Sequence, residues 1–233
     1  MFGKNNNAKK VITYAASCGH TTYDELVKYN KEQEVSALLN ELDIISVRDV
    51  NTKNFVESLT HHEPILHLDP VLIYDFSNEL KPINFDLENY IIVYSYPFNL
   101  TDEECNYIRQ FAKKHNKTIV TIGSYQKCSD IYISAHPLEV INYFKKASFI
   151  ITNTFHGTIF SIKAHTPFAT FIRKDVNAEK LSDLLDRLNF KARQLNSYSE
   201  IENIYNKSID FSYSDDLLKL EKERSIEYLK NNI

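Results

Sequence analysis

The chain has 233 residues, enough for one large hydrophobic core or two small ones, and 43% of them are hydrophobic, as in ordinary globular proteins. A net charge of −4 argues against the strongly basic face of a nucleic-acid-binding protein, so we expect no nucleic-acid partner. No apolar run approaches the roughly 20 residues that a membrane span requires. The N-terminus MFGKNNNAKK also lacks the apolar core of a signal peptide, and the three widely spaced cysteines form no metal-ligand pattern. We therefore expect a cytoplasmic protein with reduced thiols.

Strands and helices are predicted to alternate along the first part of the chain. We expect a strand over 11–17, one or two helices over 23–42, a strand at Ile44–Val47, a helix over 50–59 and a strand at Ile65–Leu68. The polar segment 75–89 contains Pro82 and shows no period, which is typical of a linker.

A second alternation follows this linker. It comprises a strand at Tyr90–Tyr94, a helix over 101–115, a strand at Lys117–Ile122, a helix at Pro137–Ala147, the segment 148–172 described below, a helix with its apolar face at Leu181, Leu184, Leu185 and Leu188, and a charged helix over about 214–230. This alternation predicts an α/β fold with parallel sheets in two Rossmann-like units, the first of them incomplete. The predicted domains are 1–80, 81–212 and a C-terminal helix over 213–233.

Residues 148–172, SFIITNTFHGTIFSIKAHTPFATFI, form the most informative segment. It is predicted to be a buried strand, a polar turn, a helix that begins near Phe155 and ends before Pro167, and a second strand at Phe168–Ile172. His156 then lies in the first helical turn, at the carboxyl end of a strand. Ligands bind at such ends in open α/β sheets, and the free N–H groups and dipole of the helix favour an anion there.

This segment resembles the core motif of the polysaccharide pyruvyl transferase family, in which a "TxSFHG-type" or "T-S-R-x-H" turn precedes a helix and a "PF" strand. Four other blocks occur in the family's order: VITYAASCG at 11–19, ELDIISVRD at 41–49, HLDPVLIY at 67–74 and NAEKLSDLLDRLNFKAR at 177–193. The resemblance implies a GT-B-like arrangement of the two Rossmann-like units. Members usually carry roughly a hundred further residues before the first block, a typical domain-sized addition, so the chain resembles an N-terminally shortened member.

The resemblance also implies a reaction. It is the transfer of pyruvate from phosphoenolpyruvate to a sugar of a cell-surface polysaccharide as a ketal, with phosphate as the leaving group. The expected partners are phosphoenolpyruvate and a glycan or lipid-linked sugar acceptor, with no cofactor and no metal. His156 is the expected general acid because histidine titrates near neutral pH; the alternative for it is a residue that caps the helix. Arg48 is expected to bind phosphoenolpyruvate, or else to pair with a neighbouring aspartate.

The other candidate site residues each have a structural alternative. Asn153 and Thr154 would bind phosphate oxygens or cap the helix, and Gly157 would allow close approach of a ligand or tight packing. Asp69 would orient an arginine or a sugar hydroxyl, or end a strand in a turn. In one branch of the family an arginine stands where this chain has Thr154, and we expect Arg173 and Lys174 to supply the missing charge unless they form a solvated basic loop.

Two other functions remain open. One is a GT-B glycosyltransferase that uses a nucleotide sugar, although the sequence shows no paired-glutamate donor motif. The other is a non-catalytic remnant of the pyruvyl transferase family that binds an anion or a partner.

Overall fold

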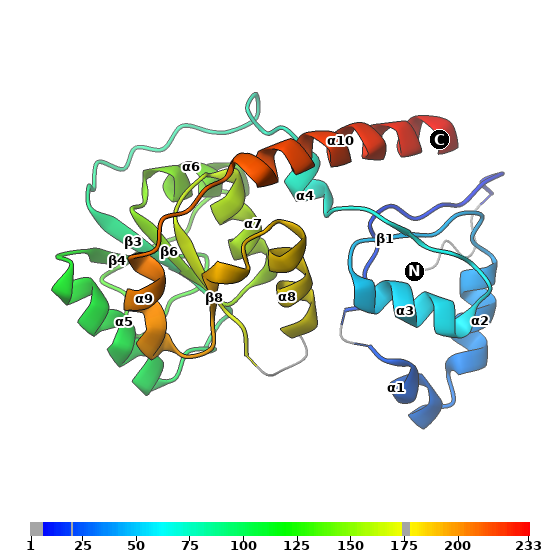
Figure 1. Ribbon diagram of the computed structural model, residues 1–233, viewed down its shortest axis with the longest axis horizontal. Coiled ribbons are helices and arrows are strands. Elements are labelled where there is room, and N and C mark those ends of the chain that lie inside the picture. Colours follow the sequence, from blue (N-terminus) through cyan, green and yellow to red (C-terminus); the bar gives the residue numbers. More distant parts are fainter. Residues whose placement is uncertain (1–6, 20, 174–177) are drawn as a thin grey trace. The chain divides into compact units, whose positions relative to one another are not determined.

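The computed structural model describes residues 7–19, 21–173 and 178–233, and the chain divides into two compact units (Figure 1). The first unit consists of Met1–Tyr74 together with Asp216–Ile233, and the second consists of Asp75–Asp215. The main difference from the predicted domains is that most of the last helix belongs with the first unit. The domain bounds 1–80, 81–212 and 213–233 stay a prediction.

A parallel sheet forms the centre of the second unit. Within the described residues it has six strands, in the order β5-β4-β3-β6-β7-β8. Their bounds are β3 (Tyr90–Tyr94), β4 (Thr118–Ile122), β5 (Ile131–Ile133), β6 (Phe149–Thr152), β7 (Phe168–Phe171) and β8 (Gln194–Leu195). The register pairs Tyr90 with Thr118 on one side of β3 and Tyr94 with Thr152 on the other. The strands that precede β6 extend the sheet from β3 in one direction, and β6, β7 and β8 extend it in the other. The carboxyl ends of β3 and β6 therefore flank a topological switch point, the usual ligand position in such sheets.

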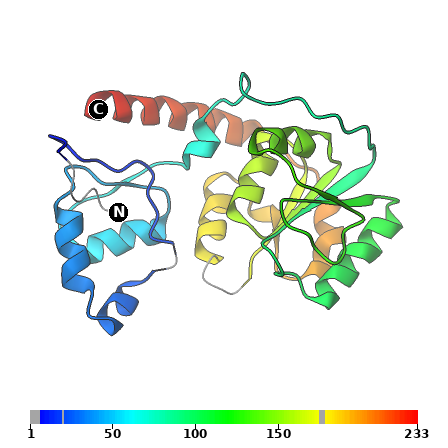
Figure 2. The same cartoon turned by 180° about the vertical axis from the view of Figure 1, so that it is seen from behind.

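Helices cover both faces of this sheet (Figures 1 and 2). They are α5 (Asp102–Lys114), α6 (Pro137–Lys146), α7 (Phe155–Lys163), α8 (Ala178–Arg187) and α9 (Ile201–Tyr205), with short 3₁₀ turns at Lys191–Arg193 and Tyr198–Glu200. Val93 and alternate strand residues pack against α5 and α9, whereas the ring of Tyr94 meets Phe144 of α6 and Phe160 of α7. Because both faces are covered, the central strands read as almost unbroken apolar runs.

The first unit has a smaller sheet. Its elements are α1 (Tyr23–Lys28), α2 (Glu32–Asn40), β1 (Ser46–Val47), α3 (Val50–Leu59), β2 (Ile65–Leu66) and α4 (Pro70–Ile73). β1 and β2 are parallel, and Leu26, Leu39, Val47 and Val56 belong to the core beside them. The last helix, α10 (Ser212–Asn232), begins in the second unit and ends in the first, where Tyr228 donates a hydrogen bond to the carbonyl of Thr13 at 2.7 Å.

Most predicted elements are present within one to three residues of their expected bounds, and a capping box of Thr101 and Glu104 begins α5. The predicted strand over 11–17 is wrong. The segment makes only isolated parallel bridges, Ile12 to Ile44 and Ala16 to Val47. Ala15 lies between them with φ of 46°, in the left-handed region, and this conformation interrupts an extended strand.

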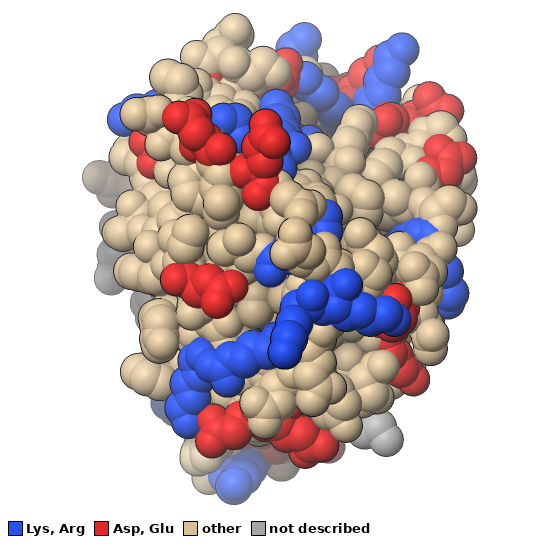
Figure 3. All heavy atoms as spheres, turned by 90° about the vertical axis from the view of Figure 1, so that its left-hand side faces the viewer, with Lys and Arg blue, Asp and Glu red and all other residues tan. Residues whose placement is uncertain are grey.

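The thiols, the hydropathy of the helices and the surface charge were each considered from composition alone. Cys18, Cys105 and Cys128 are free thiols, and burial, followed by the neighbouring Cys105, raises the pKa of Cys128 to about 12. No described helix has the length and apolar character needed to cross a membrane. Both signs of charge occur, among a larger area of uncharged residues, on the side of the molecule that Figure 3 shows.

Candidate functional site

Hydroxyl groups build the turn that joins β6 to α7 in the second unit. Thr152 Oγ1 donates to the carbonyl of Tyr94 at 2.7 Å and accepts from the backbone N–H of Thr154 at 3.1 Å. Thr154 Oγ1 in turn accepts from the N–H of Gly157 at 2.9 Å and so caps α7. Since both threonines are at least 95% buried, these bonds fix the path of the chain into the helix. Thr154 therefore caps the helix, as its structural alternative predicts, and its phosphate-binding role stays a prediction.

Gly157 has a steric reason to be glycine. A Cβ atom at this position would lie 2.2 Å from Thr152 Oγ1, 2.7 Å from Thr154 Oγ1 and 2.9 Å from Cδ1 of Tyr94. All three neighbours belong to the turn or to the adjacent strand β3. The glycine thus allows tight packing of the helix start against the sheet, and this is the structural alternative given to it above.

His156 follows the cap and is exposed in the first turn of α7. Its ring lies 5.7 Å from the ring of Phe155 and 6.2 Å from that of Phe160, centre to centre. The cap of α7 is made by Thr154 and not by the histidine side chain, so capping does not account for His156. The imidazole is accessible at the carboxyl edge of the sheet, as a general acid must be.

The electrostatics of this helix start favour a negative ligand. The cap residue Thr154 is uncharged, and the first turn of α7 contains no acidic residue. The partial positive charge at the helix N-terminus is therefore not compensated by a carboxylate of that turn.

A polar cluster lies beside this turn, at the ends of β3, β6 and β7. Asn153 Nδ2 donates to Asn99 Oδ1 at 2.5 Å, and the guanidinium of Arg173 donates to the carbonyl of Asn99 at 2.6 Å and to Glu104 Oε2 at 2.7 Å. Arg173 also lies over the ring of Phe171 at 5.3 Å. The carboxylate of Glu104 thus forms an ion pair with Arg173, the residue whose positive charge was expected to bind an anion. Lys174 lies outside the described residues.

Arg48 and Asp69 form an ion pair in the first unit. Arg48 NH1 donates to Asp69 Oδ2 at 2.5 Å, and Arg48 Nε lies 3.9 Å from Asp49 Oδ2. Asp69 also caps α4 by accepting from the N–H of Val71 at 2.9 Å. Asp69 therefore both orients an arginine and begins a turn, two of the functions considered for it. The Arg48 side chain keeps 23% of its surface exposed, which leaves it accessible to a ligand.

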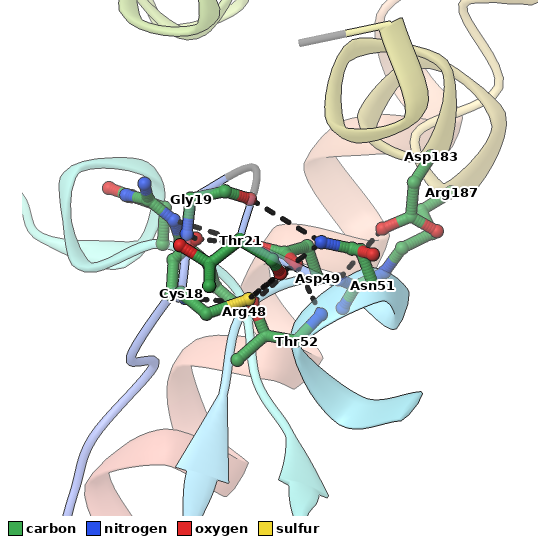
Figure 4. A network of polar contacts seen from close by, with 11 residues as sticks. Cys18, Gly19, Thr21, Arg48, Asp49, Asn51, Thr52, Asp183 and Arg187 are labelled. Carbon is green, nitrogen blue, oxygen red and sulfur yellow. Dashed lines mark hydrogen bonds and ion pairs between the residues drawn. The ribbon is translucent and has the colours of Figure 1, made fainter. Parts of the chain in front are cut away.

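A network of side chains surrounds this arginine (Figure 4). Asp49 caps α3 by accepting from the N–H of Thr52 at 2.8 Å, and it also accepts from Thr52 Oγ1 at 2.6 Å and Ser17 Oγ at 2.8 Å. Thr52 Oγ1 in turn accepts from the N–H of Cys18 at 3.1 Å. The block at 11–19 is thereby tied to the block at 41–49, so the two sequence motifs form one local structure.

The first unit also contains a cavity of about 630 Å³. Its lining is chiefly apolar, with side chains such as Val35, Leu39 and Phe55, and reaches Cys18 and Thr52 at one end. Arg48 and Asp69 are not among the described residues that line it. The cavity and the ion pair are therefore separate features of this unit.

The structure brings together Asn153, Thr154, His156, Gly157 and Arg173 at one edge of the second unit's sheet, and it pairs Arg48 with Asp69 in the first unit. Sequence reasoning missed Asn99 and Glu104 as members of the polar cluster, and it did not assign Asp49 as a cap. Asp49 has a detectable signal, because an aspartate directly before a predicted helix is a typical N-cap. Asn99 has none, since it joins the cluster only through the pairing of β3 with β6. Within the described residues, no group of three or more His, Cys, Asp or Glu is arranged to hold a metal ion.

Comparisons with known proteins agree with this architecture. The family described as polysaccharide pyruvyl transferase matches residues 1–175 of the chain. None of the curated proteins compared with the chain is significantly similar to it.

Three solved structures show its fold. UDP-GlcNAc 2-epimerase from Methanocaldococcus jannaschii, in complex with UDP-GlcNAc and UDP, has 12% identity and a TM-score of 0.53, over 91% of this chain and 68% of that one. UDP-N-acetylglucosamine 2-epimerase from Rickettsia bellii has 12% identity and a TM-score of 0.54, over 95% and 67%. UGT89C1 from Arabidopsis thaliana, complexed with UDP-L-rhamnose, has 12% identity and a TM-score of 0.50, over 94% and 62%. The predicted α/β fold of GT-B type is thus confirmed.

Proposed function

Because the chain belongs to the polysaccharide pyruvyl transferase family, we propose that it transfers pyruvate from phosphoenolpyruvate to a sugar of a cell-surface polysaccharide, in the cytoplasm and without a cofactor. The observation that carries this proposal is the exposed imidazole of His156 in the first turn of α7, a turn that itself contains no acidic residue. Phosphoenolpyruvate needs both an acid and a place for its negative charge. This turn offers the two together.

His156 is the general acid in this proposal. It gives its proton to the methylene carbon of phosphoenolpyruvate, which makes the central carbon electrophilic. One sugar hydroxyl adds to that carbon, a second hydroxyl displaces phosphate, which leaves with the proton of that hydroxyl, and the two new C–O bonds close the ketal. After the first step the neutral imidazole can accept a proton from a hydroxyl, so His156 acts first as the general acid and then as the general base.

Arg48 binds the carboxylate or phosphate of the donor in this proposal. The 2.5 Å bond to Asp69 holds the planar guanidinium in place. Its accessible surface allows a charge-assisted bond to a second oxyanion. Asp69 is then a positioning residue, and it acts through Arg48.

The test uses the full chain and measures thermal stability and phosphate release as phosphoenolpyruvate is added. A ligand that binds only the folded protein adds about 2.7 kcal/mol at a hundredfold excess over Kd. We expect phosphate release in the presence of an acceptor sugar, and a loss of roughly 100-fold or more in His156→Gln. His61→Gln is the matched control, because His61 is also exposed but lies in a loop of the first unit; it should behave as the wild type.

Two results would contradict the proposal. Stabilisation by a UDP-sugar and not by phosphoenolpyruvate would favour a nucleotide-sugar glycosyltransferase, the alternative with which the GT-B fold is compatible. Stabilisation by phosphoenolpyruvate without phosphate release in any sugar, unchanged in His156→Gln, would favour a protein that binds the anion without catalysis.

A further inference from the structure

Three polar groups at the switch point of the second unit have no hydrogen-bond partner among the described residues. They are Ser95 Oγ, Asn153 Oδ1 and the Nε–H of Arg173. Ser95 is 94% buried and Asn153 is 93% buried. Leaving such groups unsatisfied costs free energy, so native proteins pair them with water or a ligand.

The three groups belong to one cluster. The register pairs Tyr94 with Thr152, the last residues of β3 and β6, so Ser95 and Asn153 directly follow two neighbouring strands whose spacing is about 4.8 Å. Asn99 connects Asn153 with Arg173, because its side-chain oxygen accepts from the first and its carbonyl from the second. The Arg173 side chain is 26% exposed, which connects the cluster with solvent.

The chemistry of these groups selects their ligand. Asn153 Oδ1 only accepts a hydrogen bond, the Nε–H of Arg173 only donates one, and the hydroxyl of Ser95 does both. A carboxylate, or a phosphoryl group that carries no proton, has only acceptor oxygens and would face the carbonyl oxygen of Asn153 with like partial charge. A hydroxyl group accepts from Arg173 and donates to Asn153 at once. Glu104 lies 2.7 Å from Arg173, so the cluster carries little net charge, which also disfavours an anion.

We propose that Ser95, Asn153 and Arg173 form a hydroxyl-binding subsite for the sugar acceptor, and that Asn99 and Glu104 are positioning residues for it. This assignment rests on the proposed function for its substrate class. It places the sugar at the switch point between β3 and β6, beside the turn that carries His156. Arg173 thereby becomes a residue of acceptor binding and not of donor charge.

Ser95→Ala is the most informative variant, because it removes a hydroxyl that has no partner among the described residues. Binding of D-glucose, D-galactose and D-mannose to the full chain, measured by ligand-observed NMR at up to ~100 mM sugar, should weaken roughly two- to tenfold, the effect of one hydrogen bond. Its melting temperature without sugar should stay the same or rise. Inorganic phosphate, which the carbonyl oxygen of Asn153 disfavours at this cluster, should bind the variant and the wild type equally.

Ser148→Ala is the matched control at the opposite edge of the same sheet. Ser148 Oγ donates to the carbonyl of Tyr90 at 2.8 Å, so this variant should lose thermal stability and keep its sugar affinity. The two serines thus separate a ligand contact from a structural one.

Each other outcome overturns the subsite. If the wild type binds none of the three sugars, the cluster holds water only; if Ser95→Ala binds sugar like the wild type, or loses phosphate affinity to the same degree, the assigned chemistry is wrong. Phosphoenolpyruvate separates this failure from that of the proposed function. A response to phosphoenolpyruvate that depends on His156, without sugar binding, refutes the subsite alone, whereas Ser95-dependent sugar binding without that response refutes the donor and keeps the subsite.

Discussion

The N-termini of α3 in the first unit and α7 in the second are both capped by a side chain, but the capping groups differ in charge. Each helix follows a short parallel strand and begins with a buried cap residue, Asp49 or Thr154. At α3 the cap is a carboxylate, and Asp69 adds a second carboxylate at Arg48. At α7 the cap and its neighbour Thr152 are hydroxyls without formal charge.

This difference determines which helix start can receive an anion. The carboxylate of Asp49 already compensates the dipole of α3, so a negative ligand there depends on the guanidinium of Arg48. The hydroxyl cap of α7 carries no charge that would compensate the dipole of that helix. In the proposed function the two units therefore contribute to anion binding by different means, one through a side chain and the other through a helix terminus.

The largest effect is expected from Gly157→Ala, which breaks the packing of the hydroxyl-built turn. The new Cβ would overlap two threonine hydroxyls and the Tyr94 ring, and the turn must shift to admit it. We expect a loss of about 2–4 kcal/mol in the free energy of unfolding, measured by urea denaturation.

Gly123→Ala is the control for backbone strain alone. Gly123 has φ of 71°, and no atom lies within 4 Å of the position that its Cβ would take, so the substitution should cost about 1 kcal/mol. Equal losses in the two variants would show that strain, and not the close approach at α7, limits the turn.

The sequence predicts such turns better than it predicts what surrounds them. The strand, polar turn and helix at 148–163 are local features, set by β-rich residues, capping oxygens and a 3.6-residue period, and the structure confirms them, with the helix beginning at the expected Phe155 and ending at Lys163. The strands β5 and β8 were missed because they have three and two residues, too few to show a period. The strand expected over 11–17 failed at Ala15, whose left-handed conformation has no signal in its residue type.

For the candidate site too, the sequence indicated residues within contiguous motifs but not the contacts between distant segments. His156, Thr154 and Gly157 follow from one contiguous motif, and Arg48 and Asp69 from two others. The Asn99–Asn153 and Glu104–Arg173 contacts join residues 54 and 69 positions apart, and only the order of β3, β6 and β7 brings them together. Chain topology, which the sequence does not display locally, accounts for what was missed.

A smaller effect distinguishes the two caps directly. Asp49→Ala removes the acceptor of Ser17 Oγ and of both donors of Thr52, and should cost about 2–3 kcal/mol locally. Thr154→Ala removes one cap bond to Gly157 and should cost about 1 kcal/mol. Hydrogen exchange of the amides in α3 and α7 measures each local loss. If Thr154→Ala lowers protection as much as Asp49→Ala, the hydroxyl cap is worth as much as the carboxylate, and the contrast between the two helix starts disappears.

The smallest effect concerns a carboxylate of the second unit away from its strand ends. Hydrogen bonds from His115 at 2.9 Å and Lys114 at 3.0 Å lower the pKa of Glu202 on α9. A carboxyl whose pKa is lower in the folded state stabilises the protein above its unfolded pKa, about 4.3, and this contribution is lost as the pH falls toward the folded value. Glu202→Gln should therefore cost less than about 1 kcal/mol at pH 7, since the pair is partly exposed, and progressively less as the pH falls below the unfolded pKa. Glu103→Gln, at an exposed position of α5, is the control. Hydroxyls do not titrate in this range, so the turn at α7 should keep its exchange protection while the Glu202 pair weakens. A parallel loss at α7 would show that the pair on α5 and α9 supports the hydroxyl-built edge from the far side of the sheet.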